Sequence, residues 1–226
     1  MKRVVYYIQT LFALTLSVPL VVAKSLVGAK LFKSSDLLRT TSLNLKPEAG
    51  YCFEFGVYSG YTINQFAEMI RDQKQNTIYG FDSWKGFSES WTGMNVDYPI
   101  DHFARTNLPI VARNVNLIDG WIENTFPKFI GEHKDQLLLD KISFIHIDTD
   151  TYTPAKIILG EAKPYFQVGT VIVFDELIGY NGFWRHEWRA LREELADYKY
   201  EWICIGIVIP LIKVAIKIVE LPRDNF

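Results

Sequence analysis

Residues 51–61 read YCFEFGVYSGY, and this stretch decides the fold. An apolar run leads to an acid, Glu54, and two glycines follow at Gly56 and Gly60. An amphipathic pattern begins at Thr62, so the stretch predicts a buried strand, a tight glycine turn and the start of a helix. Glycine lets a ligand approach the backbone, and the free N–H groups of a helix start attract a negatively charged group. For these residues taken alone, a strand-to-helix turn that binds nothing is the alternative.

The alternation of strands and helices along the chain predicts an α/β fold with a doubly wound, mostly parallel sheet. Two apolar runs around Pro210 predict a closing hairpin that adds an antiparallel strand. The predicted strands are 51–55, 77–81, 111–118, 142–147, 169–174, 201–209 and 213–220, and the predicted helices are 62–73, 120–128, 132–139, 154–162 and 184–198.

Composition limits the classes of function. Hydrophobic residues make up 49% and charged residues 22% of the 226 residues, which is typical of a globular chain with one large domain. The net charge is −2 without a long basic run, and this argues against nucleic acid as a partner. Cys52 and Cys204 both lie in apolar runs, with no CxxC pair, so we expect buried free thiols in a reducing compartment rather than zinc ligands.

Four acids lie at or just after the predicted strand ends: Glu54, Asp82, Asp148 and Asp175. The carboxyl ends of parallel strands meet at one edge of a sheet, so these acids converge there, where open α/β sheets bind their ligands. A solvated loop or helix-cap role is the alternative for each acid taken singly. Together they favour a site.

Asp82 follows Gly60 by about the distance at which a dinucleotide fold places its ribose-binding acid. The glycine pattern is E-x-G-x-x-x-G, however, and lacks the third glycine that allows tight packing around a pyrophosphate. The pattern therefore favours an adenosine cofactor without a pyrophosphate over NAD.

A second acidic constellation consists of HIDTDTY at 146–152 and the pair Asp175-Glu176. Two carboxylates at one strand end and two at the next offer hard oxygen ligands that suit Mg²⁺. The alternative is a group of carboxylates that share protons or pair with Arg185 or Arg189.

The chain resembles class I S-adenosylmethionine-dependent methyltransferases, in particular the macrocin O-methyltransferase-like (TylF/MycF-like) family. The resemblance covers roughly residues 50–220 and rests on FEFGVYSG (53–60), YGFDSWKGFSE (79–89), DGWIENTFPKF (119–129), FIHIDTDTYTPAKIIL (144–159) and GTVIVFDELIGYNGFWRHEW (169–188). It implies a Rossmann-like, seven-stranded sheet with a C-terminal antiparallel hairpin strand.

The resemblance also implies residue roles. Implied cofactor residues are Glu54, Gly56, Gly60, Asp82, Ser83, Asp119, Gly120 and Trp121, and implied magnesium ligands are Asp148, Asp175 and Glu176. The resemblance leaves the general base open, and His102, His146 and His186 are the candidates. We expect Asp148, His102 and His186 to be catalytic, and His146 to be a buried, hydrogen-bonded histidine. The family commonly has Asp-Asp where this chain has Asp175-Glu176, which puts the geometry of the metal site in question.

We therefore expect an S-adenosylmethionine-dependent, Mg²⁺-assisted O-methyltransferase that acts on a hydroxyl of a sugar or other small natural product. Two alternatives stay open. Asp148-Thr149-Asp150 is a DxD sequence, which metal-dependent nucleotide-sugar glycosyltransferases use to hold a metal and a diphosphate. A non-catalytic, cofactor-binding member of the methyltransferase fold is the other.

The N-terminus lies outside the resemblance. We expect residues 1–45 to form an apolar helix and linker before a methyltransferase domain at 46–226. Residues 4–23 are almost wholly apolar and about as long as a membrane-spanning helix. A cleaved signal, a membrane anchor and a helix packed on the domain or on a second subunit of a homo-oligomer are the interpretations. A cofactor-dependent enzyme favours a cytoplasmic location, with membrane association through residues 4–23 left open.

Overall fold

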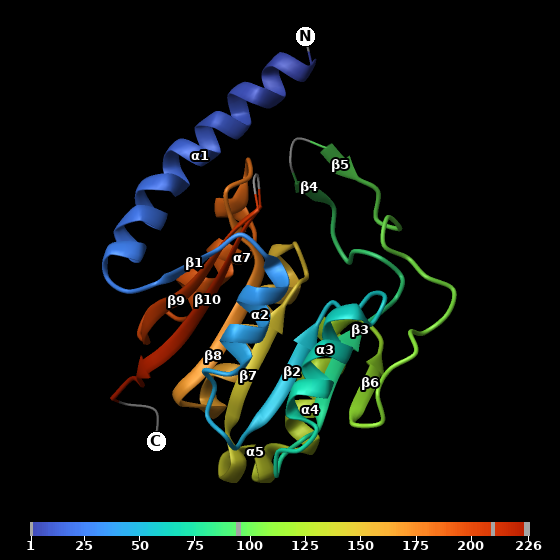
Figure 1. Cartoon of the computed structure of the whole chain (residues 1–226). Helices are drawn as coiled ribbons and strands as arrows, with labels where there is room; N and C mark the ends of the chain where they lie inside the picture. Colours follow the sequence, from blue (N-terminus) through green and yellow to red (C-terminus); the bar gives the residue numbers. More distant parts are fainter. Residues whose placement is uncertain (1, 94–95, 209–210, 224–226) are drawn as a thin grey trace.

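The computed structural model describes residues 2–93, 96–208 and 211–223 of the chain (Figure 1). Its helices are α1 (Lys2–Leu26), α2 (Ser35–Leu43), α3 (Tyr61–Ile70), α4 (Ile122–Glu132), α5 (Lys134–Asp140), α6 (Tyr152–Ala162) and α7 (Glu187–Glu194), with short 3-10 helices η1 (Lys163–Tyr165) and η2 (Phe183–Arg185). Its strands are β1 (Lys30–Phe32), β2 (Tyr51–Phe55), β3 (Ile78–Asp82), β4 (Trp91–Gly93), β5 (Val96–Tyr98), β6 (Val115–Asp119), β7 (Ile142–Ile147), β8 (Phe166–Ile178), β9 (Lys199–Val208) and β10 (Leu211–Glu220).

The strands form one large sheet in the order β1-β9-β10-β8-β7-β2-β3-β6, and β4 and β5 form a separate hairpin. Strands β6, β3, β2, β7 and β8 are parallel, whereas β10 is antiparallel to both β8 and β9. This confirms the predicted α/β fold with a C-terminal antiparallel strand. The described sheet has eight strands rather than seven, because β1 pairs in parallel with β9 at the edge.

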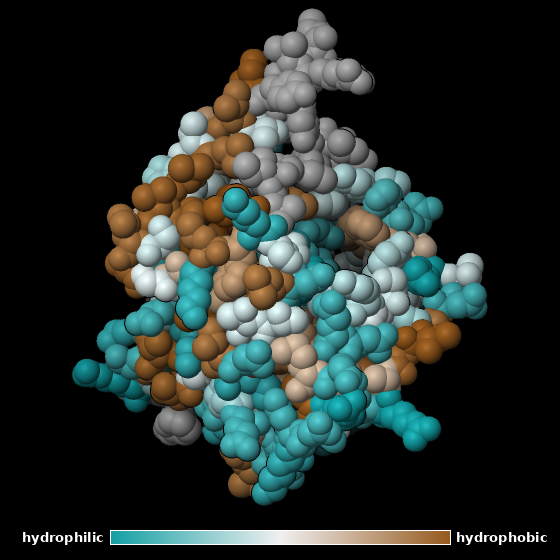
Figure 2. All heavy atoms as spheres, viewed as in Figure 1, coloured by the Kyte–Doolittle hydropathy of each residue, from teal (hydrophilic) through white to brown (hydrophobic). Residues whose placement is uncertain are grey.

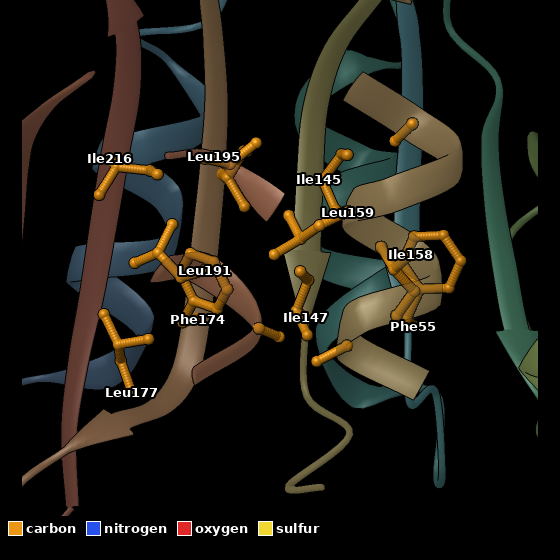
Figure 3. Packing of buried hydrophobic residues seen from close by; sticks show 14 of the residues in the cluster. Phe55, Ile145, Ile147, Ile158, Leu159, Phe174, Leu177, Leu191, Leu195 and Ile216 are labelled. Atoms are coloured by element: carbon orange, nitrogen blue, oxygen red, sulfur yellow. The ribbon is translucent and has the colours of Figure 1, made fainter. Parts of the chain in front are cut away.

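Helices cover both faces of the sheet. One cluster of buried side chains joins α2 and α3 to the sheet, for example through Leu38 and Phe66. The other joins α4, α6 and α7 to the opposite face, and Figure 3 shows Ile158 and Leu159 of α6 and Leu191 of α7 against the strands. A central parallel strand is thus covered on both sides, which explains why every residue of β7 is buried.

The local pattern accounts for the helix that follows the glycine turn. In α3 the buried residues are Ile63, Phe66, Ala67 and Ile70, a spacing that places them on one face of a helix. Gly60 precedes this helix with φ +81°, a left-handed conformation that glycine adopts without strain. The turn therefore delivers α3 onto the sheet immediately after β2.

The N-terminal helix α1 lies apart from the helices that cover the sheet (Figure 1). By length and composition, its segment Ile8–Leu26 is the one described helix that could cross a membrane. The elements after α1 are part of the folded body and not a linker of the kind predicted. Strand β1 joins the sheet, and α2 packs against α3 and β9. Residues 30–43 thus contribute to the body that also holds the acidic edge.

Candidate active site

A cavity of about 350 Å³ opens at the carboxyl ends of the parallel strands. Its walls come from the glycine turn after β2, the loop after β3 with the β4–β5 hairpin, the start of α4, and the ends of β7 and β8. Its lining residues include Gly56, Asp82, Ser83, Phe87, Trp91, Tyr98, His102, Phe103, Trp121, Asp148, Asp150, Asp175 and Glu176.

Gly56 is required by a close approach of two strand ends. A β-carbon added to it would lie 1.9 Å from the Asp148 carbonyl oxygen, and its φ is +86°. The Asp148 N–H also donates to the Phe55 carbonyl at 2.9 Å. The glycine therefore lets the turn after β2 lie directly against the acidic loop after β7.

Asp82 joins the two loops on the other side of the cavity. Its Oδ2 accepts from the Tyr58 N–H at 2.7 Å, and its Oδ1 accepts from the Trp84 N–H at 2.8 Å. The Trp84 indole N–H in turn donates to the Tyr58 carbonyl at 2.9 Å. Tyr58 and Trp84 both have positive φ values, a strain that the surrounding hydrogen bonds hold in place. Each carboxylate oxygen can accept further hydrogen bonds, so Asp82 can also bind ligand hydroxyls.

The predicted cofactor residues separate into two groups. Gly56, Asp82, Ser83 and Trp121 line the cavity. The other four are absent from the described lining residues: Glu54, Gly60, Asp119 and Gly120. Asp119 is exposed even though it lies in register with Asp82 on the neighbouring strand, and Glu54 is fully buried beneath the edge.

Asp175 lies in a buried group of opposite charges, which we call the paired cluster: Asp175, Arg39, Lys213 and His146. Asp175 Oδ1 accepts from Arg39 Nε at 2.9 Å and also from Arg39 Nη2, while Oδ2 accepts from the Lys213 ammonium. Burial alone would raise the pKa of Asp175, but His146, Lys213 and Arg39 outweigh it and hold the pKa well below its usual range. Asp175 is therefore an ionised carboxylate with its cations already in place.

His146 connects the paired cluster to Glu54. Its Nε2 lies 3.4 Å from Asp175 Oδ1, and its Nδ1 lies 3.5 Å from Glu54 Oε2. The second distance is within ion-pair range, although the two atoms do not meet hydrogen-bond geometry. Burial alone would lower the pKa of His146, but the two carboxylates raise it to about 9. His146 is thus the buried, hydrogen-bonded histidine that the sequence predicted, and it is a cation at neutral pH.

A second group of acids lacks such partners, and we call Asp148, Asp150 and Glu176 the unpaired cluster. Their carboxylate oxygens lie within 4.8 Å of one another. Glu176 Oε2 is buried without a hydrogen-bond partner, and the Lys213 ammonium lies 3.7 Å from Oε1. Burial and the neighbouring acids raise the pKa values of all three carboxyls. Mutual repulsion of this kind is relieved by a bound cation.

The unpaired cluster fits a divalent cation better than the predicted set of Asp148, Asp175 and Glu176. The orphaned Glu176 oxygen can still act as a ligand, whereas Asp175 is engaged by Arg39 and Lys213. His146, Asp175 and Asp148 also lie close enough together to form a possible set of metal ligands. A protonated imidazole, however, offers no lone pair to a metal.

The predicted catalytic histidines lie in different places. His102 lines the cavity, next to Tyr98 and Phe103 at ring distances of 4.7 and 4.6 Å. His186 is not among the described lining residues and stacks on Tyr180 at 6.2 Å. Burial lowers the pKa of His186, with Glu89 and Arg185 acting in opposite directions.

Three residues of the acidic edge were missed by sequence reasoning: Arg39, Lys213 and Glu187. Glu187 is fully buried at the start of α7, and its Oε1 accepts from the Thr149 N–H at 3.3 Å between the two acids of the unpaired cluster. An acid next to the predicted His186 was the only signal for it. Arg39 and Lys213 carried no signal, because nothing in the sequence relates them to Asp175.

Comparison with known proteins agrees with this geometry. Residues 53–177, more than half of the chain, match the family described as a methyltransferase domain, and the chain belongs to that family. It is an enzyme of the S-adenosylmethionine-dependent methyltransferase class. The family match favours this class over a glycosyltransferase, the DxD sequence notwithstanding.

Solved structures share the fold. The calicheamicin methyltransferase CalS11 is 23% identical, with a TM-score of 0.58 over 80% of this chain and 76% of that chain. The O-methyltransferase NovP is 18% identical, with a TM-score of 0.57 over 82% of this chain and 79% of that chain. A search of curated proteins found no match.

Proposed function

We propose that this chain transfers a methyl group from S-adenosylmethionine to a hydroxyl of a sugar or other small natural product, with assistance from Mg²⁺, as in macrocin O-methyltransferase-like enzymes. One observation carries the proposal. A single cavity is lined both by the glycine turn with Asp82 and by the unpaired cluster. A site for the methyl donor and a site for the acceptor hydroxyl would thus share one cavity.

For the cofactor we propose Gly56, Asp82, Ser83 and Trp121. Gly56 leaves room for the methionine part to approach the backbone, since any side chain there would meet Asp148. Asp82 would accept hydrogen bonds from the ribose hydroxyls, with Ser83 and the Trp121 ring beside the adenine. Asp82 also fixes Tyr58 and Trp84, so it shapes the pocket in addition to binding in it.

For the metal we propose Asp148, Asp150 and Glu176, since Asp175 is already engaged by Arg39 and Lys213. Bound there, Mg²⁺ would supply positive charge that favours loss of the acceptor's hydroxyl proton. The buried Glu187 orients the loop that carries Asp148 and Asp150, because it accepts the Thr149 N–H.

Aromatic side chains form another part of the cavity wall. Trp91 stacks on Tyr98 at 4.7 Å, and Phe87 contacts Phe103 edge-on at 5.3 Å. These rings offer an apolar surface to the C–H face of a sugar, while the acids of the cavity offer acceptors to its hydroxyls. S-adenosylmethionine, when bound, would supply the methyl group to the acceptor oxygen and leave as S-adenosylhomocysteine, and His102, which lines the cavity, would take the hydroxyl proton.

A calorimetric titration with S-adenosylhomocysteine tests the cofactor part. We expect micromolar binding to the full chain, its loss in Asp82→Ala, and a change of less than twofold in Asp119→Ala. The two aspartates lie in register on adjacent strands, so the second variant is a matched control. Equal loss in both variants would contradict the proposed cofactor set.

Transfer of a radioactive methyl group to a panel of nucleotide-linked deoxysugars tests the acceptor part. This panel is chosen because CalS11 is a TDP-rhamnose 3'-O-methyltransferase, and its apo structure is similar to this chain at 22% identity and a TM-score of 0.53. Transfer that EDTA abolishes and Mg²⁺ restores supports the proposal. Binding of a nucleotide sugar by a protein that does not bind S-adenosylhomocysteine would contradict it.

A further inference from the structure

The outward face of α1 is largely apolar from Ile8 to Leu26. Its exposed large side chains are Ile8, Leu11, Phe12, Leu16, Val18, Val22 and Leu26. At 100° per residue these positions fall on one side of the helix. The polar Thr15 in the same face has its hydroxyl bonded to the Phe12 carbonyl at 2.6 Å. Figure 2 shows hydrophobic residues gathered where Figure 1 places this helix.

The inward face of α1 is fixed to the protein. Ala13 and Ser17 are fully buried, and Val21 joins the hydrophobic cluster that also holds Trp202. The ammonium of Lys24 lies 5.7 Å from the centre of the Trp202 ring. The helix is therefore oriented by small residues on one side, while its large apolar residues face away from the domain.

The charged residues of the segment that contains this helix all have one sign. Residues 1–35 contain five basic residues, namely Lys2, Arg3, Lys24, Lys30 and Lys33, and no acidic residue. The remaining 191 residues contain 19 basic and 26 acidic residues. Lys30 and Lys33, just beyond the helix end, are exposed. A positive segment on a negative protein is suited to a negatively charged partner.

We propose that α1 is an in-plane anchor that lays its outward face into the surface of an anionic lipid bilayer. The apolar residues enter the boundary between headgroups and acyl chains, and Lys30 and Lys33 face the headgroup phosphates. The buried contacts of Ala13, Ser17 and Val21 hold the helix along the domain, which disfavours a spanning orientation. A second copy would bring the same positive segment against itself, so charge favours the bilayer over a dimer.

Flotation of the full chain with vesicles tests the proposal. The vesicles are phosphatidylcholine alone, or phosphatidylcholine with phosphatidylglycerol at about three to one. We expect flotation with the anionic vesicles, and a fall in bound fraction of at least tenfold in the double variant Leu11→Glu/Leu16→Glu. The matched control is Ile110→Glu/Leu139→Glu, two exposed apolar residues far from α1 in the chain, and it should bind within twofold of the parent.

The charge part has its own pair of variants. Lys30→Glu/Lys33→Glu should weaken binding to the anionic vesicles severalfold. A salt concentration of about 0.5 M should weaken binding of the parent protein in the same way. The matched control, Lys128→Glu/Lys134→Glu on α4 and α5, should bind the vesicles as the parent does. Three results would overturn the proposal: full binding by Leu11→Glu/Leu16→Glu, resistance of bound protein to alkaline carbonate extraction as expected for a span, or a lipid-free dimer that the same double variant dissociates.

Discussion

The paired and unpaired clusters meet at the cavity wall, where Asp175 lies next to Glu176, and they differ in charge balance. In the paired cluster, Asp175 meets a guanidinium, an ammonium and a protonated imidazole. In the unpaired cluster, Asp150 and Glu176 are buried and Asp148 is half-buried, and the Lys213 ammonium lies 3.7 Å from Glu176 Oε1. Adjacent residues of one strand, Asp175 and Glu176, thus belong to opposite electrostatic environments. An acid at the carboxyl edge is a binding group only where the fold has left its charge uncompensated.

The largest expected effect comes from removing a cation of the paired cluster. Lys213→Met leaves the buried Asp175 with one fewer counter-charge, and we expect the free energy of unfolding to fall by about 3 kcal/mol. Chemical denaturation measures this. Lys217→Met, on the same strand, should cost less than about 1 kcal/mol.

A second substitution distinguishes charge from packing in that experiment. Adding Asp175→Asn to Lys213→Met should cost less than the sum of the two single losses, because each single variant already breaks the Lys213–Asp175 pair. If the two losses simply add, the methylene stem of Lys213 matters more than its charge, and the comparison of the two clusters fails.

The raised pKa of His146 predicts a pH dependence of the free energy of unfolding that is nearly as large. Because its pKa is raised to about 9 from an ordinary 6.5, the folded chain holds a proton that the unfolded chain releases between these values. The stabilisation is fully present below pH 6.5 and is lost as pH rises through 9, an expected decline of about 3 kcal/mol. Denaturation at several pH values should show a decline that His146→Gln removes and His102→Gln keeps. A parent protein of constant stability across this window would contradict a protonated His146.

The expected effect on Mg²⁺ binding is smaller in free energy, and it compares the two clusters directly. Asp150→Asn should weaken Mg²⁺ binding at least tenfold, about 1.4 kcal/mol, because it removes one of the three proposed carboxylate ligands. Calorimetric titration with Mg²⁺ measures this, and Asp119→Asn, outside the cavity, should bind as the parent does. A greater loss of affinity in Asp175→Asn than in Asp150→Asn would return the metal to the set that the family resemblance implies.

The sequence was sufficient for what local pattern determines. Apolar runs and a glycine turn predicted β2, β7 and β8 and brought the acids of these strand ends to one edge. It failed where a contact depends on distant chain segments, since Arg39 and Lys213 are 136 and 38 residues from Asp175. It also missed β1, because a three-residue edge strand has no periodicity of its own and is defined by its pairing with β9.

The same limit explains why Asp175 was predicted to bind metal. Motif position puts Asp175 and Glu176 at the correct strand end, and only the three-dimensional structure reveals which of them already has counter-ions. Because Asp175 and Glu176 are both buried, the neighbouring charges, rather than burial or residue type, determine which acid of this edge has a lowered pKa.

The smallest expected effect tests this last point at Glu187. Burial raises the pKa of Glu187 well above its usual range, and the neighbouring Glu176 and Asp148 raise it further. Glu187→Gln has nearly the same shape and keeps an oxygen to accept the Thr149 N–H, so the free energy of unfolding should change by less than about 1 kcal/mol. Glu187→Ala, which removes that acceptor and leaves a cavity, should cost about 2 kcal/mol. A loss in Glu187→Gln as large as in Lys213→Met would mean that Glu187 is an ion with an essential partner and belongs with the paired cluster.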